Sequence, residues 1–301
     1  MTTAPMTLPP LMSAQQALWG LARQSLRAYL KNVVIDSRPD PRPFGEVAEP
    51  WQWEKILDPL IPAVESIARL RTEPPKYDGY WFVLTKGSDK TSAIARICSW
   101  VLQFSHHYTS ISVGAADLDQ AALLRDAMES EKRLNPWFHQ DYKINRYDAS
   151  GPTGALDILT SDAASGQGKR SLIYIADEIT VWRSQDMWDL FAGSASKYRD
   201  CLLIVLSNAG WLHTWQAELF EQVKSDPRWF VYEAPGIMAS WIDRAKVASL
   251  RKKMLATEAM RVFDNIWVQN LQNAVFPAEL VEQVWRTHRY RALDLPDTVG
   301  A

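Results

Sequence analysis

Cysteine is nearly absent from this sequence. Only Cys98 and Cys201 occur among the 301 residues, and their positions fit no metal-ligand spacing. We expect both to act as small buried hydrophobes, Cys98 within a helix and Cys201 at the start of a strand. Cysteine usage therefore indicates a protein of a reducing compartment.

Long hydrophobic runs are also missing. No apolar stretch approaches the roughly 20 residues that cross a bilayer. The N-terminus lacks the charged segment followed by an apolar one that marks a secretory signal. We therefore expect a cytoplasmic protein that does not enter a membrane.

The third scarce quantity is net charge, which is −2. Such a chain has no global positive field, so any grip on DNA would have to come from a local basic patch. A hydrophobic content of 47% and a charged content of 23% are ordinary for a globular protein. The length allows one large α/β domain or two small ones.

From Tyr80 onward, short apolar runs alternate with helical patterns. Between the first two runs, apolar residues recur from Ile94 to Leu102 with the period of a helix. This alternation predicts an α/β fold with a mostly parallel central sheet flanked by helices and joined by right-handed crossovers. The expected strands are 80–84, 110–115, 156–161, 172–176, 202–206 and 229–234.

Helical additions are expected at both ends of this core. An amphipathic pattern predicts a helix over 15–34, three prolines within 36–43 predict an extended connector, and a further helix is expected over 51–70 with Pro59 and Pro62 disturbing its middle. A polar helical stretch follows over 243–270. We therefore divide the chain into an N-terminal helix and connector (1–45), a core (46–240) and a helical subdomain (241–301).

The most informative segment joins a buried strand to two carboxylates. Apolar residues from Leu172 to Ala176 run directly into Asp177 and Glu178. At the carboxyl end of a parallel strand, Asp177 would hold the Mg²⁺ of a nucleotide, directly or through water. Glu178 would polarise the water that attacks the γ-phosphate. The alternative is that a strand-end carboxylate caps the next helix.

A second segment has the form of a phosphate-binding loop. The apolar run 80–84 leads to Lys90 and Thr91, and a helical pattern follows. Lys90 would reach the β- and γ-phosphates, Thr91 would bind Mg²⁺, and backbone N–H groups would hold phosphate oxygens. An ordinary strand–turn–helix connection with a surface lysine fits the same pattern. The residues predicted to bind ATP and Mg²⁺ here are Lys86, Gly87, Ser88, Asp89, Lys90, Thr91 and Ser92.

Asp89 stands where such loops have glycine. Glycine tolerates unusual dihedrals and lets the backbone approach phosphate closely, whereas aspartate adds a Cβ and a negative charge facing an anion. The usual first glycine is also missing, because Leu84 lies six positions before Lys90. Three accounts are open: a tolerated variant, a weakened or inactive ATPase, or a deliberate substitution.

Two further segments carry weaker signals. The strand 202–206 ends in Ser207 and Asn208, which would face the γ-phosphate and sense hydrolysis if this strand lies beside the acid strand. The run Ser-Asn-Ala-Gly also suits an ordinary turn. The amide of Gln52 could pair with the donor and acceptor of adenine, or Gln52 could be a surface residue.

Taken in order, these segments resemble the ATPase domain of the large terminase subunit, the DNA-packaging motor of tailed bacteriophages. The resemblance covers residues 45–275, and its order and spacing are more specific than any single piece. It implies a P-loop NTPase fold of the ASCE type, which has an additional strand in its sheet. It rests on Pro50-Trp51-Gln52, the 86–92 loop, Ile111-Ser112-Val113-Gly114-Ala115-Ala116 with Gln120-Ala121, Ser165-Gly166-Gln167-Gly168, Asp177-Glu178 with Trp182, and Ser207-Asn208-Ala209-Gly210.

The resemblance also implies roles by position. Gln52 matches the adenine-reading glutamine, and Lys86 matches a basic residue within the family's variant phosphate loop. The family keeps glycine at the position of Asp89, which puts ATP turnover by this sequence in question. Lys90 and Thr91 match the loop lysine and hydroxyl. Asp177 and Glu178 match the metal-binding and catalytic acids. Ser207 and Asn208 fall at the coupling motif.

Partners follow from the same resemblance. Such enzymes form a homo-oligomeric ring, often a pentamer, on the portal protein of an empty capsid in the host-cell cytoplasm. They act with a small terminase subunit and pump double-stranded DNA inward. They cut it with an RNase H-like nuclease domain, for which residues 271–301 are too short. We therefore expect this sequence to represent the motor half alone.

Contacts in trans and with DNA are less defined. Ring ATPases commonly complete a site with an arginine from the neighbouring subunit, and Arg146, Arg170 and Arg199 are candidates. Each also fits a plain surface charge. A basic cluster could touch DNA phosphates or simply form a solvated helix face, and its members are Arg244, Lys246, Arg251, Lys252 and Lys253.

Two other functions are compatible with the sequence. A helicase-like or restriction-type translocase uses the same acid pair, although it calls for further nucleic-acid motifs that do not follow here. A catalytically silent module that binds nucleotide or assembles a ring without turnover is favoured by Asp89 alone. ATP hydrolysis by this chain and by an Asp89→Gly variant would separate these possibilities.

Overall fold

The computed structural model describes residues 13–160, 170–198 and 200–269. Its centre is an eight-stranded sheet with the order β10-β3-β9-β8-β4-β7-β6-β5. The strands from β10 to β7 run parallel to one another, and β6 and β5 continue the sheet in antiparallel orientation. A separate antiparallel pair joins β1 (Val34–Ile35) to β2 (Arg42–Pro43).

The predicted strands are confirmed, with ends that differ by two residues or fewer. Sequence analysis missed only short pairs, β1 with β2 and β5 with β6, because two to four residues carry too little periodicity. The strands of the main sheet are β3 (Gly79–Val83), β4 (Thr109–Ala115), β5 (Lys143–Ile144), β6 (Asp148–Gly151), β7 (Gly154–Thr160), β8 (Ile173–Asp177), β9 (Leu202–Ser207) and β10 (Trp229–Glu233).

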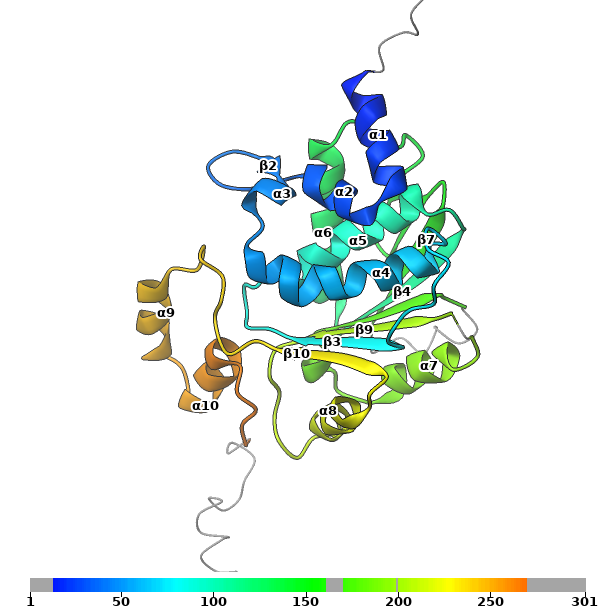
Figure 1. The fold of residues 1–301 in the computed structure, drawn as a ribbon. Coiled ribbons are helices and arrows are strands. Elements are labelled where there is room, and N and C mark those ends of the chain that lie inside the picture. Colours follow the sequence, from blue (N-terminus) through cyan, green and yellow to red (C-terminus); the bar gives the residue numbers. More distant parts are fainter. Residues whose placement is uncertain (1–12, 161–169, 199, 270–301) are drawn as a thin grey trace, which may run out of the picture.

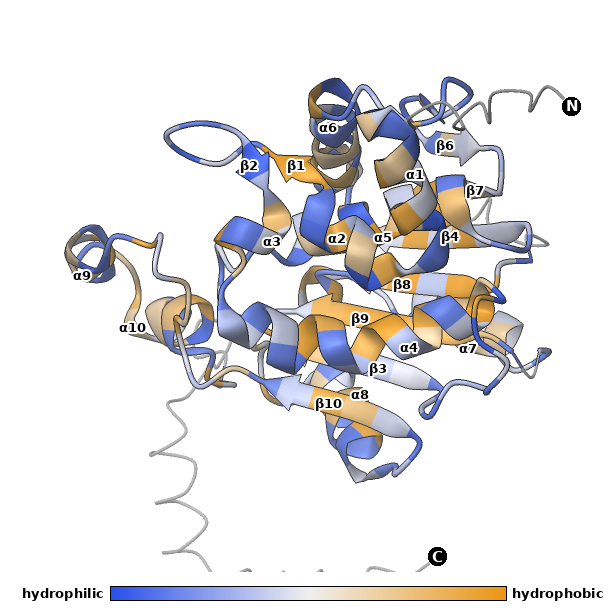
Figure 2. Cartoon of the chain, turned by 45° about the horizontal axis from the view of Figure 1, so that its top comes forward, coloured by the Kyte–Doolittle hydropathy of each residue, from blue (hydrophilic) through white to orange (hydrophobic). Residues whose placement is uncertain are grey.

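Strand β3 shows why these apolar runs form a buried sheet. Successive side chains of a strand point to opposite faces, and both faces here are covered. Tyr80 and Phe82 enter one hydrophobic core, whereas Trp81 and Val83 enter the other. All five residues of β3 are buried. Figure 2 shows the resulting band of hydrophobic strands between helices with polar outer faces.

Helices cover both faces of the sheet, so the fold has three layers (Figure 1). One face carries α1, α2, α4, α5 and α6, and the other carries α7 and α8. The bounds of these helices are α1 (Ala14–Gln24), α2 (Leu26–Asn32), α4 (Asp58–Ile67), α5 (Lys90–Phe104), α6 (Leu118–Leu134), α7 (Asp186–Ala195) and α8 (Trp215–Ser225), with a short α3 (Phe44–Val47) and a 3-10 turn η3 (Ile179–Val181).

Three predicted helices are interrupted. The helix expected over 15–34 breaks at Ser25, whose hydroxyl accepts the Ala28 N–H and so begins α2. The helix expected over 51–70 opens with a π-helical stretch, η1 (Gln52–Leu57), just before Pro59, whose ring removes a backbone donor. The stretch expected over 243–270 consists of α9 (Arg244–Arg251), α10 (Ala256–Ala259) and a π-helical turn, η4 (Met260–Asp264).

The strand order explains how the site is assembled. Strand β9 lies between β3, which leads into the predicted phosphate loop, and β8, which carries the acid pair. This inserted strand is the additional strand of the ASCE arrangement, so the predicted fold class is confirmed. Parallel strands place their carboxyl ends at one edge of the sheet, where ligands of open α/β folds bind.

The cysteines behave as predicted. Cys98 in α5 and Cys201 immediately before β9 are both buried free thiols. Within the described ranges, no helix is long and apolar enough to cross a membrane.

Candidate functional site

The loop between β3 and α5 contains two residues with left-handed backbone. Gly87 has φ 83°, and Asp89, at the N-cap of α5, has φ 60° and ψ 24°. Glycine adopts this region freely and aspartate adopts it more readily than most residues. Asp89 therefore reproduces the local turn that glycine would make, and it keeps the N-terminus of α5 facing the loop.

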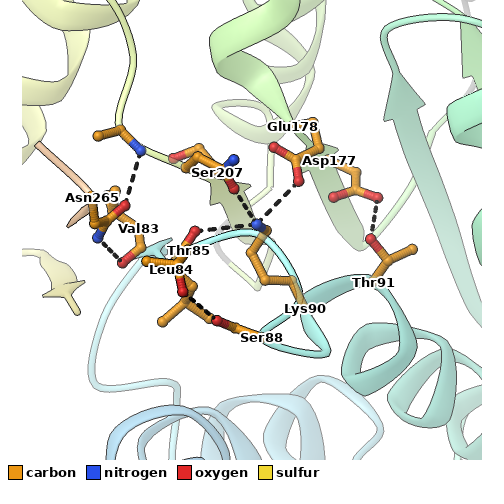
Figure 3. A network of polar contacts seen from close by, with 12 residues as sticks. Val83, Leu84, Thr85, Ser88, Lys90, Thr91, Asp177, Glu178, Ser207 and Asn265 are labelled. Carbon is orange, nitrogen blue, oxygen red and sulfur yellow. Dashed lines mark hydrogen bonds and ion pairs between the residues drawn. The ribbon is translucent and has the colours of Figure 1, made fainter. Parts of the chain in front are cut away.

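Lys90 lies at the centre of the site (Figure 3). Its side chain is only 5% exposed, and its ammonium contacts groups from three strand ends. It donates to the Leu84 carbonyl at 3.2 Å, donates to Asn208 Oδ1, and forms an ion pair with Glu178 Oε1 at 3.1 Å. A buried cation needs such partners, and here they converge where a phosphate of a nucleotide would be bound.

Thr91 and Asp177 form the second contact of the site. The Thr91 hydroxyl donates to Asp177 Oδ2 at 3.0 Å, which joins α5 to the end of β8 (Figure 3). Asp177 Oδ1 is buried and has no hydrogen-bond partner among the described residues. Burial, with the neighbouring Glu178 carboxylate as second cause, raises the pKa of Asp177 to about 7.

These two residues fit a hard divalent cation. Mg²⁺ is held by one or two carboxylates together with hydroxyl, water and phosphate oxygens. The unpartnered, buried Oδ1 of Asp177 and the adjacent Thr91 hydroxyl offer such a donor set. Across the described ranges, no group of three or more His, Cys, Asp or Glu residues could hold a metal by itself, so further ligands would come from a nucleotide and water.

Glu178 follows the strand with a left-handed backbone, φ 50° and ψ 45°. This turn lifts its side chain out of the sheet, where it is 21% exposed and faces Lys90. A non-glycine residue in this region carries backbone strain, which is often stored at functional sites. No side-chain capping bond is made by Glu178 to the short η3 turn that follows, so its contact is with the lysine.

The last residue of β9, Ser207, and the next residue, Asn208, point in different directions. Asn208 reaches Lys90, as described above. The Ser207 hydroxyl accepts the indole N–H of Trp81 at 3.0 Å and is fully buried. Ser207 nevertheless contacts the loop through its backbone, because its carbonyl accepts the Leu84 N–H at 2.8 Å. Asn208 is thus the member of this pair whose side chain faces the site.

Among the other predicted ligands of a nucleotide, Gln52 lies beside the loop. It is buried, its oxygen accepts the Glu49 N–H at 3.0 Å, and its Nε2 donates to Asp89 Oδ2 at 3.4 Å. Pairing with adenine would require it to exchange these partners. Ser88 is buried and bonds Thr85 at 3.0 Å, Lys86 and Gly87 are exposed, and Ser92 is half-buried in the first turn of α5.

Sequence analysis placed the Asp89 carboxylate opposite a bound anion. In the structure it pairs with the guanidinium of Arg96, two turns further along α5. Arg96 is 2% exposed and had not been identified as a site residue. Side-chain pairs that a helical sequence predicts lie three or four positions apart, so the spacing of seven between Asp89 and Arg96 gave no signal.

Residues 236–268, which we call the C-terminal segment, also contact the strand ends and the loop of this site. Asn265 is buried at the carboxyl ends of three strands, with its amide donating to the carbonyls of Val83 and Ala234, both at 2.9 Å. Its Oδ1 accepts the Ala209 N–H at 3.0 Å (Figure 3). It has φ 58°, a conformation in which asparagine commonly ends a helix.

The C-terminal segment also contacts the phosphate loop directly. The Trp241 indole donates to the Gly87 carbonyl at 3.0 Å, and the Lys86 N–H donates to the Val262 carbonyl at 3.3 Å. The sequence placed Trp241 and Val262 only within the helical subdomain (241–301) and predicted no contact with the loop. Their role depends on contacts far along the chain, so only the helix-ending asparagine had a local signal.

The remaining candidates lie elsewhere. Arg170 precedes β8, so it is near the opposite end of that strand from Asp177, and Arg146 lies between β5 and β6 at the far side of the sheet. Arg199 and the motif Ser165-Gly166-Gln167-Gly168 are outside the described residues. In the basic cluster, Arg251 pairs with Asp264 at 2.5 Å, while Lys246, Lys252 and Lys253 are exposed.

No protein-family model and no curated protein matches this chain. Solved structures do match. The HK97 bacteriophage large terminase is 18% identical with a TM-score of 0.61, over 81% of this chain and 55% of that chain. The Thermus phage P74-26 large terminase ATPase domain is 14% identical with a TM-score of 0.54, over 68% of this chain and 97% of that one.

A third match carries a nucleotide. The large terminase from another thermophilic bacteriophage, in complex with ATP-gamma-S, is 11% identical with a TM-score of 0.51, over 68% of this chain and 52% of that one. This chain has the fold of a large terminase ATPase domain. It spans about half the length of the HK97 terminase and of the ATP-gamma-S-bound terminase. The resemblance inferred from sequence motifs is therefore confirmed for the fold.

Proposed function

We propose that this chain is an ATP-driven motor that translocates viral double-stranded DNA into a procapsid. One observation carries the proposal: Lys90 and Thr91 of the phosphate loop meet Asp177, Glu178 and Asn208 at the carboxyl ends of β8 and β9. The terminase ATPase fold and the ATP-gamma-S complex of the thermophilic-phage terminase support the same conclusion.

Binding of ATP follows from the loop. Lys90 would exchange Glu178 and Asn208 for oxygens of the β- and γ-phosphates, and the N-terminus of α5 would add backbone donors. Thr91 and Asp177 would hold Mg²⁺, which neutralises phosphate charge when bound. Gln52 would read adenine, and Lys86, Gly87, Ser88 and Ser92 would line the triphosphate. Asp89 belongs to the same loop.

Hydrolysis follows from Glu178. Once Lys90 has turned to phosphate, the Glu178 carboxylate is free to accept a hydrogen bond from water and orient it toward the γ-phosphate. Asn208 loses its lysine contact at the same moment. It can therefore report the state of the nucleotide to β9 and, with Ser207, couple hydrolysis to movement of the helical parts.

Partners are proposed from the terminase fold. We expect a homo-oligomeric ring, a pentamer when active, working in the host-cell cytoplasm with the portal protein and the small terminase subunit. Within each subunit, residues 46–240 would form the ATPase core, with the N-terminal helix and connector (1–45) and the helical subdomain (241–301) attached to it.

ATP hydrolysis with Mg²⁺, measured for the purified chain and for Lys90→Ala, tests the proposal. We expect turnover that the Lys90→Ala variant loses, together with binding of duplex DNA. Asp89→Gly is measured beside them, because it places glycine where such loops have it. Absence of both nucleotide binding and turnover in the natural chain and in Asp89→Gly, each folded by circular dichroism, would contradict the motor.

Asp89 favours a second candidate function, a nucleotide-binding or assembly module without turnover. Its carboxylate lies in the loop that would receive the triphosphate. Turnover that appears only in Asp89→Gly would support this candidate, since it would show a motor design that is silent in the natural chain.

A further inference from the structure

The side chain of Asp89 is held by two residues distant from the acid pair. Its carboxylate pairs with the Arg96 guanidinium, and Oδ2 also accepts from Gln52 Nε2 at 3.4 Å. Asp89 is 23% exposed in its side chain and Arg96 only 3%. The carboxylate is therefore turned along α5 toward a buried cation.

Arg96 is fixed in place by its surroundings. Its guanidinium lies over the ring of Phe44 at 4.2 Å from the ring centre, which is within the range of a cation–π contact. Phe44 is itself buried at the start of α3. A guanidinium buried to this degree needs an anion beside it.

Besides Asp89, a second acid interacts with the charge of Arg96. It is Glu131 on α6, which is 4% exposed. Burial raises the pKa of Glu131 to about 8, even though the Arg96 charge opposes the shift. The shift favours the neutral form of Glu131, and the ion pair that Arg96 forms in the described part of the chain is with Asp89.

We propose that Arg96 is a positioning residue that neutralises Asp89 and thereby makes a phosphate loop with aspartate in place of the glycine before its lysine competent to bind a nucleoside triphosphate. The inference rests on the proposed function and deepens it. The turn that glycine would supply is kept by the left-handed backbone of Asp89. The charge that glycine would not have carried is cancelled by Arg96, so Asp89 and Arg96 act as one unit.

A double-mutant cycle tests this pairing. The variants are Arg96→Met, Asp89→Asn and the double variant, and the readout is the dissociation constant for ATP-gamma-S with Mg²⁺. Asparagine keeps the shape and the left-handed backbone but removes the charge. We expect Arg96→Met to weaken binding roughly tenfold or more, because an unpaired carboxylate then faces the triphosphate. Asp89→Asn should bind ATP-gamma-S at least as tightly as the natural chain, because the carboxylate is then removed from the loop.

The double variant decides the outcome. If the pairing acts through charge, Asp89→Asn restores the affinity that Arg96→Met lost. If Arg96 serves only the packing of α5, the double variant binds as poorly as Arg96→Met, and the inference is overturned. Arg96→Lys keeps the charge and should retain most of the affinity; a loss equal to that of Arg96→Met would also overturn it.

Arg125→Met is the matched control, because Arg125 is ion-paired with Asp126 on α6 at 2.7 Å but lies on the surface. It should leave nucleotide affinity unchanged. Failure of the inference is distinguishable from failure of the function. A natural chain that binds nothing while Asp89→Asn binds overturns the inference alone. Absence of binding in both overturns the proposed function.

Discussion

Two regions hold the phosphate loop, and they differ in what they contact. The sheet edge contributes Glu178 and Asn208, whose side chains reach the buried ammonium of Lys90. The C-terminal segment contributes Trp241 and Val262, which bond backbone groups of the exposed residues 86 and 87. The sheet edge contacts the charged ammonium of Lys90, whereas the C-terminal segment contacts backbone groups of the loop.

We therefore expect the two regions to affect different properties, the sheet edge the chemical step and the C-terminal segment the binding of nucleotide to the loop. The Glu178 and Asn208 side chains at the sheet edge contact the buried ammonium of Lys90, so their replacement should change catalysis. The C-terminal segment engages the Lys86 N–H, which is one of the donors that a phosphate-binding loop offers to its ligand. We therefore expect its replacement to change stability and nucleotide affinity, and to leave the chemical step intact.

The largest effect is expected for Glu178→Gln at the sheet edge. The amide cannot accept a proton, so ATP turnover should fall by about 100-fold or more while ATP binding is retained. Steady-state hydrolysis and ATP-gamma-S affinity measure the two separately. Unchanged turnover would remove Glu178 from its assigned role.

A pH effect on Asp177 comes next. The pKa of this carboxyl is about 7 in the folded protein against an ordinary value of 3.8, chiefly because of burial. Between these values the folded state binds a proton that the unfolded state has released. The free energy of unfolding of the ligand-free protein should therefore decrease as pH rises through this window.

Asp177→Asn provides the comparison for that measurement. It removes the titrating group, so the difference in unfolding free energy between the natural chain and the variant should shrink or reverse with rising pH. Chemical denaturation at several pH values between the two pKa values would show it. A pH-independent difference would mean that the carboxyl is ionised throughout.

Asn265→Ala tests the C-terminal segment. The change leaves the carbonyls of Val83 and Ala234 and the N–H of Ala209 without the Asn265 side chain as partner, and places alanine at φ 58°. We expect a loss of about 2–3 kcal/mol in the free energy of unfolding. Asn145→Ala is the control, since Asn145 is exposed and its amide bonds the nearby Asp148. Equal small losses in both would show that Asn265 does not brace the strands.

The smallest effect is expected for Trp241→Phe. It removes one hydrogen bond to the Gly87 carbonyl from a side chain that is 49% exposed, so stability should change by about 1 kcal/mol or less. Val262 of the same segment occupies the Lys86 N–H, a donor that phosphate would use, so we expect loosening of the segment to raise nucleotide affinity slightly. Weaker nucleotide binding would instead mean that the C-terminal segment holds the loop in the conformation that binds nucleotide.

Much of the sheet could be predicted from the sequence because its strands are buried on both faces and read as apolar runs. The position of the acid pair at a strand end followed from the same pattern. The helices were less predictable at their interruptions, as at Ser25, because a capping hydroxyl competes with helix continuation only when the surrounding packing allows it.

The site divides in the same way. Lys90, Thr91, Asp177 and Glu178 could be named in advance. The two acids stand where an apolar strand ends, the lysine and the hydroxyl begin the helix that follows another such strand, and parallel strands bring their carboxyl ends to one edge. Arg96 and Asn265 could not be assigned their roles, since neither belongs to a strand end or to the predicted loop. The burial of Arg96 depends on packing against Phe44, and the partners of Asn265 become its neighbours only when the C-terminal segment packs against the strand ends.

The sequence by itself determined the layered α/β fold and the residues that meet at the sheet edge, because hydrophobic periodicity and strand-end positions are local properties of the chain. Only the tertiary structure decided that Asp89 is paired with a buried arginine and that the C-terminal segment contacts the loop. Those outcomes depend on burial and on contacts between residues far apart along the chain, which no local pattern specifies.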